Sequence, residues 1–285
     1  MPSGPVHLLY GLVLAAAAHP GSPEYGGVIL YSSLAPDFAT AAYHDRYPDL
    51  RYVDYRWAHW PEHVHEYAEI IADRTVTPLL HLDRERTIWC AEVGISSHLF
   101  LDVYTHVRTS PIKEWRERWR IQTVLRDFYR PWDRYVEPFA RWALGNAVAI
   151  LGGEERFWRY AERACEVAEL LMGDYVRGAY LRNLSEKYFG DPNLHLVDWI
   201  RWFWDRYGYE ENPPVDLTIQ GVTITADPEE LLAWMAQFDP QVMIVEPGEP
   251  GGEGGQGEEG EGSTGTGSGG SPLPLIPVIP PLRRR

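Results

Sequence analysis

The chain has 285 residues, of which 45% are hydrophobic, so it is long enough for one large domain or two small ones with a sizeable core. Its formal net charge of −15, without an obvious basic face, argues against a nucleic-acid-binding protein. Two cysteines, Cys90 and Cys165, are too few for a disulfide framework and form no Cys-x-x-Cys pair, so we interpret them as buried thiols.

The first predicted element is Leu8–Ala18, an apolar run that ends in four alanines. We interpret it as a buried helix, because no Lys or Arg precedes it and it is too short to span a bilayer. A secretory signal peptide over residues 1–18 is the alternative. We therefore expect a cytoplasmic protein, or a secreted one if that segment is cleaved. No other segment predicts a transmembrane helix.

The chain up to residue 212 is predicted to be one helical, metal-binding domain. A short apolar segment, Tyr25–Ser33, leads to Asp37, and Pro61 then opens a helix over Glu62–Asp73. Apolar residues at helical spacing, with Gly and Pro at the boundaries, predict the rest of an all-α, multi-helix bundle. These further helices are Thr87–Val107, Ile112–Tyr129, Pro131–Leu151, Phe157–Leu171, Asp174–Tyr188 and Leu196–Tyr207.

Residues 213–244 have a different pattern. Val215–Ile219 and Val222–Thr225 alternate apolar and polar residues around the Gln220-Gly221 turn, which predicts a β-hairpin. Asp227 is then a predicted N-cap of a short helix. We expect this hairpin and helix to form a small appendage to the bundle.

Residues 245–285 are rich in Gly, Glu, Ser and Pro. Such a segment buries too little apolar surface to fold, so we expect a disordered tail. Its proline-rich end, followed by Arg283–Arg285, favours an extended polyproline II form. We interpret the tail as a spacer, and a docking peptide for a protein partner is the alternative.

The N-terminal third is where a functional site is expected, because nine of the ten histidines lie in the first 106 residues. His98 and Asp102 are four residues apart on one predicted helix, so both lie on one face and can bind one cation. Gly94, one turn earlier, gives room for a neighbouring backbone. His106, one turn later, is expected at the rim. A polar stripe on an amphipathic helix is the alternative.

Three residues elsewhere can complete this site. Asp37 follows an apolar run, where a helix N-cap is the alternative role. His7 lies just before the first apolar helix, where a surface histidine is the alternative. His59 lies between Trp57 and Trp60, where aromatic packing is the alternative.

The order of these residues resembles the zinc-dependent phospholipase C family, which is helical and related to the S1/P1 nucleases. The most specific part is the Gly-x3-His-x3-Asp-x3-His pattern of residues 94–106, preceded by Pro-Asp at residues 36–37. The resemblance implies a bundle of the phospholipase C/P1 nuclease type with Asp102 bridging two metal ions. The implied zinc ligands are His7, Asp37, His59, His98, Asp102 and, as in some members, His106.

The chain also departs from that family. No N-terminal Trp that could bind zinc through its amine is evident, and the only histidine after residue 106 is His195. The family's later His-x3-Glu pair has no counterpart, because Trp199 follows His195 at that spacing. We therefore expect one or two Zn²⁺ ions rather than three.

The implied activity is hydrolysis of a phosphoester by a zinc-dependent enzyme. A zinc-bound water ionises near pH ~7, and Asp37 is the residue expected to orient that water and take its proton. The expected substrate is a small phosphoester or a lipid headgroup. One alternative is a nuclease of the same superfamily, which the acidic composition disfavours. The other is a non-catalytic binding or assembly protein with a structural metal.

Overall fold

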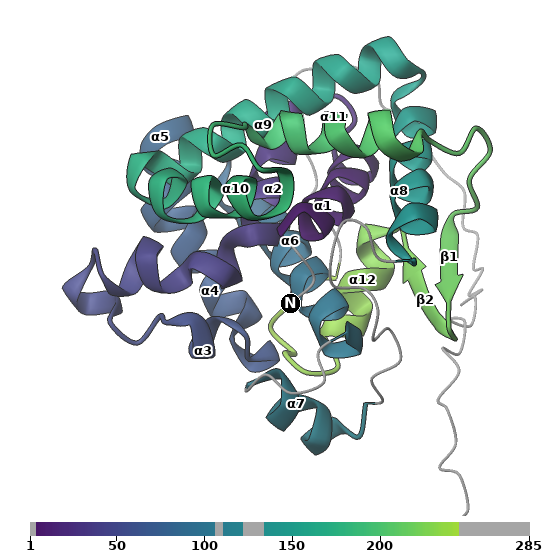
Figure 1. Ribbon diagram of the computed structural model, residues 1–285. Helices are drawn as coiled ribbons and strands as arrows, with labels where there is room; N and C mark the ends of the chain where they lie inside the picture. Colours follow the sequence, from purple (N-terminus) through teal and green to yellow (C-terminus); the bar gives the residue numbers. More distant parts are fainter. Residues whose placement is uncertain (1–3, 106–110, 122–133, 245–285) are drawn as a thin grey trace, which may run out of the picture. The chain divides into compact units, whose positions relative to one another are not determined.

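The computed structural model of the chain describes residues 4–105, 111–121 and 134–244 (Figure 1). These residues are mostly helical, with one small antiparallel hairpin, which confirms the predicted coarse architecture. The predicted tail of residues 245–285 and the predicted ligand His106 lie outside the described residues.

Three helices form the centre of the fold: α1 (Gly4–Ala18), α2 (Pro23–Ala39) and α6 (Arg84–Thr105). α1 is apolar on all sides and buried from Gly4 to Ala16, which is the pattern of an internal helix. The prediction of a buried first helix is therefore confirmed. In the described ranges, no helix has both the length and the apolarity needed to cross a bilayer.

α2 and α6 approach each other most closely at Gly94. A Cβ atom there would lie 2.5 Å from the carbonyl oxygen of Ile29 and 2.8 Å from the amide nitrogen of Ser33, so only glycine fits. This contact confirms the predicted role of Gly94 in admitting a neighbouring backbone. It also brings the end of α2 beside the α6 residues that follow Gly94.

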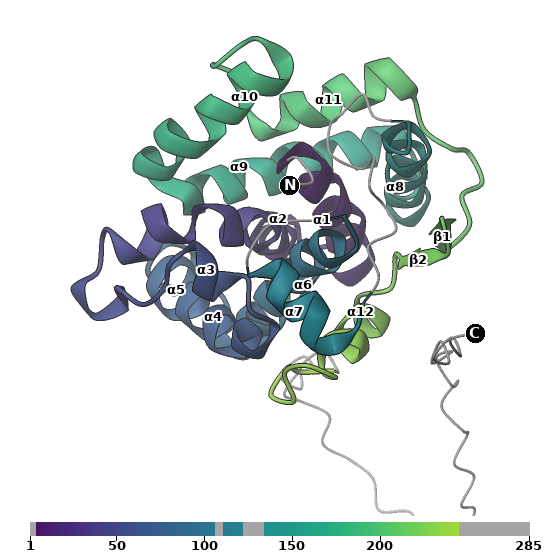
Figure 2. The same ribbon diagram turned by 60° about the horizontal axis from the view of Figure 1, so that its bottom comes forward.

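Short helical segments connect α2 to α6 on one side of this centre (Figure 2). The α-helices among them are α3 (Tyr55–Ala58), α4 (Val64–Ile71) and α5 (Thr77–Leu80). The 3₁₀ segments are Pro48–Leu50 and Pro61–His63, and the π-helical turns are Thr40–His44 and Ala72–Val76. The helix predicted after Pro61 is therefore present, but it consists of a 3₁₀ segment, an α-helix and a π-helical turn in succession.

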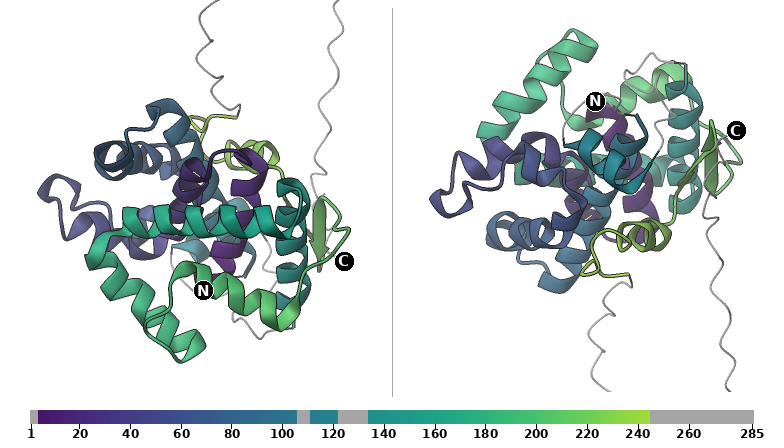
Figure 3. Two further views of the ribbon diagram at one scale, coloured as in Figure 1. Left: turned by 90° about the horizontal axis from the view of Figure 1, so that it is seen from above. Right: turned by 90° about the horizontal axis from the view of Figure 1, so that it is seen from below.

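The remaining helices cover the other sides of the centre. α9 contacts α2 and, seen from above, crosses over the purple N-terminal helices (Figure 3). The bounds of these helices are α7 (Ile112–Trp119), α8 (Val136–Leu151), α9 (Glu154–Val176), α10 (Arg182–Phe189) and α11 (Leu196–Tyr207).

Helix ends follow the predicted signals in some places and not in others. α8 ends at Gly152, which adopts a φ of 77°, as predicted. α7 ends at Trp119, ten residues before the predicted Tyr129, because Arg120 adopts the left-handed conformation. Gly173, with a φ of 62° and a ψ of 173°, interrupts the helical backbone inside α9, at the break predicted between Leu171 and Asp174. The chain then continues through the π-helical turn Arg177–Leu181 into α10.

The predicted hairpin is formed by β1 (Asp216–Ile219) and β2 (Val222–Thr225), which pair antiparallel. Asp227 caps α12 (Pro228–Met235) by accepting hydrogen bonds from two main-chain amides, as predicted. The Tyr10 hydroxyl of α1 donates to the carbonyl of Thr225, which attaches the hairpin to the centre of the fold. Through residue 244, the described chain belongs to one compact unit.

Candidate metal centre

Five predicted ligands come together where α1, α2, α3 and α6 meet. His7 lies on α1, Asp37 near the end of α2, His59 directly after α3, and His98 and Asp102 on α6. The side chains of His7, His59, His98 and Asp102 are 0% exposed and that of Asp37 is 5% exposed. The three histidines and two carboxylates therefore form a cluster almost closed to solvent, which we call the His/Asp cluster.

His98 and Asp102 lie one helical turn apart, with His98 Nε2 at 3.4 Å from Asp102 Oδ2. Both side chains point into the protein, so the alternative of a polar stripe on an amphipathic helix is wrong. Buried charges are stable only when they are paired or bind a cation. The α6 helix thus carries a polar pair in a position where packing alone would favour apolar residues.

Three ligand atoms form a nearly equilateral triangle at the centre of the cluster. His59 Nε2 lies 3.2 Å from His98 Nε2 and 3.5 Å from Asp102 Oδ2, and the third side is the 3.4 Å pair on α6. Asp37 Oδ1 lies 3.9 Å from both ring nitrogens. For comparison, nitrogen and oxygen ligands of a tetrahedral zinc are separated from one another by roughly 3.3 Å.

His7 approaches the same cluster from the other side of Asp102. Its Nε2 lies 3.4 Å from Asp102 Oδ1, and its ring stacks on that of His98 with centroids 3.8 Å apart and planes at 10°. The two oxygens of Asp102 therefore face different histidines. Ligand atoms of His7, Asp37 and His98 form a second group of three that all lie within 4.8 Å of one another.

Two main-chain carbonyls orient the rings of His59 and His98. His59 Nδ1 lies 2.7 Å from the carbonyl oxygen of Tyr55, and His98 Nδ1 lies 2.9 Å from that of Ser33. A carbonyl only accepts, so each Nδ1 carries a proton and donates it. The neutral rings therefore present the lone pairs of their Nε2 atoms to the cluster, which is the arrangement of metal-binding histidines.

Asp37 is held by a residue from a distant part of the chain. The hydroxyl of Tyr180, on the π-helical turn Arg177–Leu181, donates to Asp37 Oδ2 over 3.0 Å. In the described part of the chain, Asp37 Oδ1 has no hydrogen-bond partner. Asp37 lies inside α2, one residue before the non-helical Phe38, and caps no helix, so the N-cap alternative is wrong.

Burial and the two carboxylates give the histidines different acidities. Burial, followed by the nearby His98, lowers the pKa of both His7 and His59 to about 4. Burial also acts to lower the pKa of His98, but the charges of Asp102 and Asp37 outweigh it and raise that pKa. His7 and His59 are therefore neutral near pH 7, whereas the cluster favours one positive charge near His98.

Several residues that shape the cluster were not predicted from the sequence. Tyr180, and the residues whose carbonyls accept from the ligands, Tyr55 and Ser33, reach the ligands only through the packing of separate segments. His65 bonds Glu92 of α6, with Nδ1 and Oε1 2.6 Å apart. In the sequence, the signal for that contact is Glu92, an acidic residue among the apolar residues of the α6 segment.

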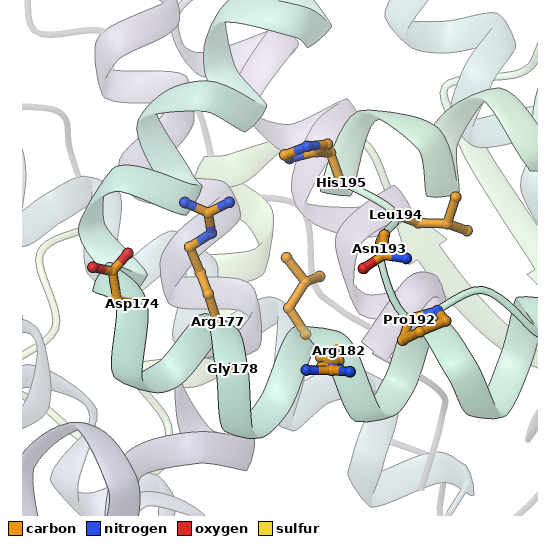
Figure 4. A pocket seen from close by; sticks show the side chains of 9 residues that line it. Asp174, Arg177, Gly178, Arg182, Pro192, Asn193, Leu194 and His195 are labelled. Atoms are coloured by element: carbon orange, nitrogen blue, oxygen red, sulfur yellow. The ribbon is translucent and has the colours of Figure 1, made fainter.

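An open cleft of about 420 Å³ lies away from the predicted site residues (Figure 4). It lies between the turn Arg177–Leu181 and the loop before α11, and its lining includes Arg177 and His195, which Figure 4 shows on these two segments. Glu169 bonds His195 Nδ1 over 2.8 Å and lies 3.5 Å from Arg177, so it offsets much of the local positive charge. His195, the one later histidine, thus caps α11 and supports the fold.

Comparisons of the chain with known protein families, with curated proteins and with solved structures find no match. The functional proposal therefore depends on the geometry of the His/Asp cluster and on the order of its residues in the sequence.

Proposed function

We propose that the chain is a zinc-dependent phosphoric ester hydrolase with a helical bundle of the phospholipase C/P1 nuclease type. One or two Zn²⁺ ions would be held by His7, Asp37, His59, His98 and Asp102. The observation that carries this proposal is the triangle of two imidazole nitrogens and one carboxylate oxygen with sides of 3.2–3.5 Å.

The residues of the cluster fit zinc in three respects. Imidazole nitrogens and carboxylate oxygens are among its usual ligands, and their separations match those around a tetrahedral ion. The Nδ1 atoms of His59 and His98 bond carbonyls, as those of zinc ligands do. Finally, neither ring nitrogen of His7 and only one oxygen of Asp37 has a hydrogen-bond partner within the described residues. Buried polar atoms without a partner are unfavourable, so a bound ligand would stabilise them.

Zinc and the residues of the chain would have different roles in hydrolysis. Zinc, when bound, supplies a Lewis acid that polarises a phosphoryl oxygen and makes water more acidic. With one ion held by the triangle of His59, His98 and Asp102, Asp37 Oδ1, which lies 3.9 Å from both ring nitrogens, would be placed to orient a water and accept its proton. Tyr180 fixes Asp37 Oδ2 and so keeps Oδ1 directed into the cluster.

The proposed substrate is a small phosphoester or a lipid headgroup. The net charge of −15 repels long nucleic acids, which places a nuclease of the same superfamily second among hydrolases.

A structural metal in a non-catalytic binding or assembly protein is the second candidate. The near-complete burial of the five ligands favours it, since a structural zinc site is closed whereas a catalytic one keeps an open position. The two candidates share the metal and differ in whether water and a substrate reach it.

Metal analysis and an assay of phosphodiester hydrolysis test the proposal together. The purified wild type should contain zinc, and His98→Ala and Asp102→Ala should lower its zinc content. His44→Ala is a matched control, because His44 is exposed and pairs with Asp45 outside the cluster. A wild type with no more zinc than the His98 and Asp102 variants sinks the proposal. Zinc without chelator-sensitive hydrolysis of a chromogenic phosphodiester would instead favour the structural metal.

A further inference from the structure

Tyr55 has a buried hydroxyl next to the His/Asp cluster that no contact explains. The oxygen is inaccessible to solvent, and it has no hydrogen-bond partner in the part of the chain that the structure describes. The residue as a whole is only partly buried. Its side chain therefore extends from the protein surface inward and ends in an unused polar group.

The position of Tyr55 is fixed by contacts with a predicted metal ligand. Its ring packs on that of His59 with centroids 4.0 Å apart, and its carbonyl oxygen accepts the hydrogen bond from His59 Nδ1. Its amide nitrogen donates to the Thr40 hydroxyl over 2.9 Å, which attaches the start of α3 to the segment after α2. Tyr55 thus has little freedom to turn its hydroxyl away.

The hydroxyl belongs to a phenol whose ring packs on that of His59, so it lies beside the cluster. A phenol loses its proton only near pH ~10, so in the neutral range it is available as a hydrogen-bond donor. A buried donor without an acceptor destabilises a protein, so an acceptor from a bound molecule would be favourable here.

Tyr55 lies next to one ligand of the cluster. Of the five ligand side chains, only Asp37 is exposed at all. Tyr55, whose ring contacts that of the ligand His59, is also partly exposed. A group bound beside His59 would therefore meet the phenol proton and the cluster together.

We propose that Tyr55 binds substrate by donating a hydrogen bond from its hydroxyl to a phosphoryl oxygen at the His/Asp cluster. This proposal rests on the zinc-dependent function given above, since bound cations would offset the charge of Asp37 and Asp102 and allow an anion to approach. The ligand chemistry is a phosphate oxyanion, which accepts hydrogen bonds and does not donate them when it is fully ionised. Inorganic phosphate shares this chemistry with a phosphoester.

The test is the binding of inorganic phosphate to the zinc-loaded, full-length chain, measured by calorimetry in the wild type and in Tyr55→Phe. We expect Tyr55→Phe to keep its zinc and its thermal stability, and to bind phosphate about tenfold more weakly, because a hydrogen bond to a charged group is lost. Tyr52→Phe is the matched control, since the Tyr52 hydroxyl bonds the exposed Glu66 and should not affect phosphate.

The possible results separate this proposal from the proposed function. Zinc-loaded Tyr55→Phe that binds phosphate as tightly as the wild type overturns the role of Tyr55 and leaves the zinc site standing. Loss of zinc in Tyr55→Phe also overturns it, because the residue would then support the ligands rather than the substrate. A wild type without zinc removes the basis of both proposals.

Discussion

The Nε2 atoms of His59 and His98 face each other across 3.2 Å, while each ring is fixed from behind by a main-chain carbonyl. Because each Nδ1 carries the proton, two neutral rings bring two lone pairs together. Such a contact is repulsive unless a cation or an added proton lies between them. The nearby carboxylates of Asp37 and Asp102 supply the negative charge that favours either one.

Asp37→Asn should separate metal binding from catalysis. Asp37 Oδ1 is 3.9 Å from the histidine nitrogens, farther than the other ligand atoms, and the amide can still accept from Tyr180. With excess zinc the variant should still be loaded, and kcat for a phosphodiester should then fall by about 10²–10⁴, the usual range for loss of a general base. Asp45→Asn, on the surface, is the control. Unchanged kcat in Asp37→Asn would contradict a role in proton transfer.

Tyr180→Phe should weaken zinc binding without removing a ligand. The change leaves Asp37 Oδ2 without its donor and allows the carboxylate to turn. Partners that orient ligands are typically worth 10–100-fold in metal affinity, so we expect a loss in that range, measured by competition with a chromogenic chelator. Tyr175→Phe is a control on the same stretch of chain, since Tyr175 is 55% exposed. Equal affinities in the two variants would argue against the positioning role.

Gly94→Ala should destabilise the protein and disturb the site together. The new methyl group would lie 2.5 Å from the Ile29 carbonyl, so α6 must move away from α2. Overpacking of this kind costs about 1–3 kcal/mol, which urea unfolding can measure. Gly21→Ala meets no atom within 4 Å and should change stability little. If Gly94→Ala is as stable as Gly21→Ala, the close contact of α2 and α6 is wrong.

Glu92 should make stability depend on pH. Burial is the main cause that raises its pKa from 4.5 to about 7, although His65 and the Met243 amide act against it and Asp239 adds to it. The folded state then holds a proton that the unfolded state releases between those pH values. The stabilisation is therefore complete below pH 4.5 and is lost as the pH rises through about 7.

The variant Glu92→Gln removes this titration. The free energy of unfolding of the wild type minus that of Glu92→Gln should decrease from pH 5 to pH 8. Taking this difference cancels the contributions of titrating groups that both proteins share. Glu69→Gln, which changes an exposed partner of Arg84, should give a difference that varies little with pH. A Glu92→Gln difference that is flat, or that increases with pH, would show that the buried carboxyl is not protonated in the folded state.

Much of the helical architecture could be predicted because its signals are local. α11 has its predicted bounds, Leu196–Tyr207, since an apolar stripe, the preceding turn and Gly208 all mark them. The break at Gly173 follows a local signal too, since the backbone there is non-helical as predicted. The π-helical turn Arg177–Leu181, inside the helix predicted over Asp174–Tyr188, could not be predicted, because helical spacing alone does not distinguish the two helical types.

The sequence pointed to the proposed ligands of the candidate site because each of them can be recognised separately. His98 and Asp102 follow from helical spacing, whereas His7, Asp37 and His59 are implied by the resemblance to the phospholipase C family. Tyr180 could not be found, because nothing near it in the sequence indicates that its hydroxyl reaches Asp37. Contacts between distant segments depend on how helices pack, and spacing along one helix carries no information about that.

Only one pair among the five ligands, His98 and Asp102, is close in sequence, and the other three come from separate segments. An unfolded chain would therefore hold a metal ion weakly, whereas the folded chain offers all five side chains at once. Binding to the folded state alone adds about 2.7 kcal/mol of stability when free metal exceeds its Kd by 100-fold. If the proposed zinc site is occupied, the supply of zinc would thus also affect how long each molecule survives heating or proteolysis.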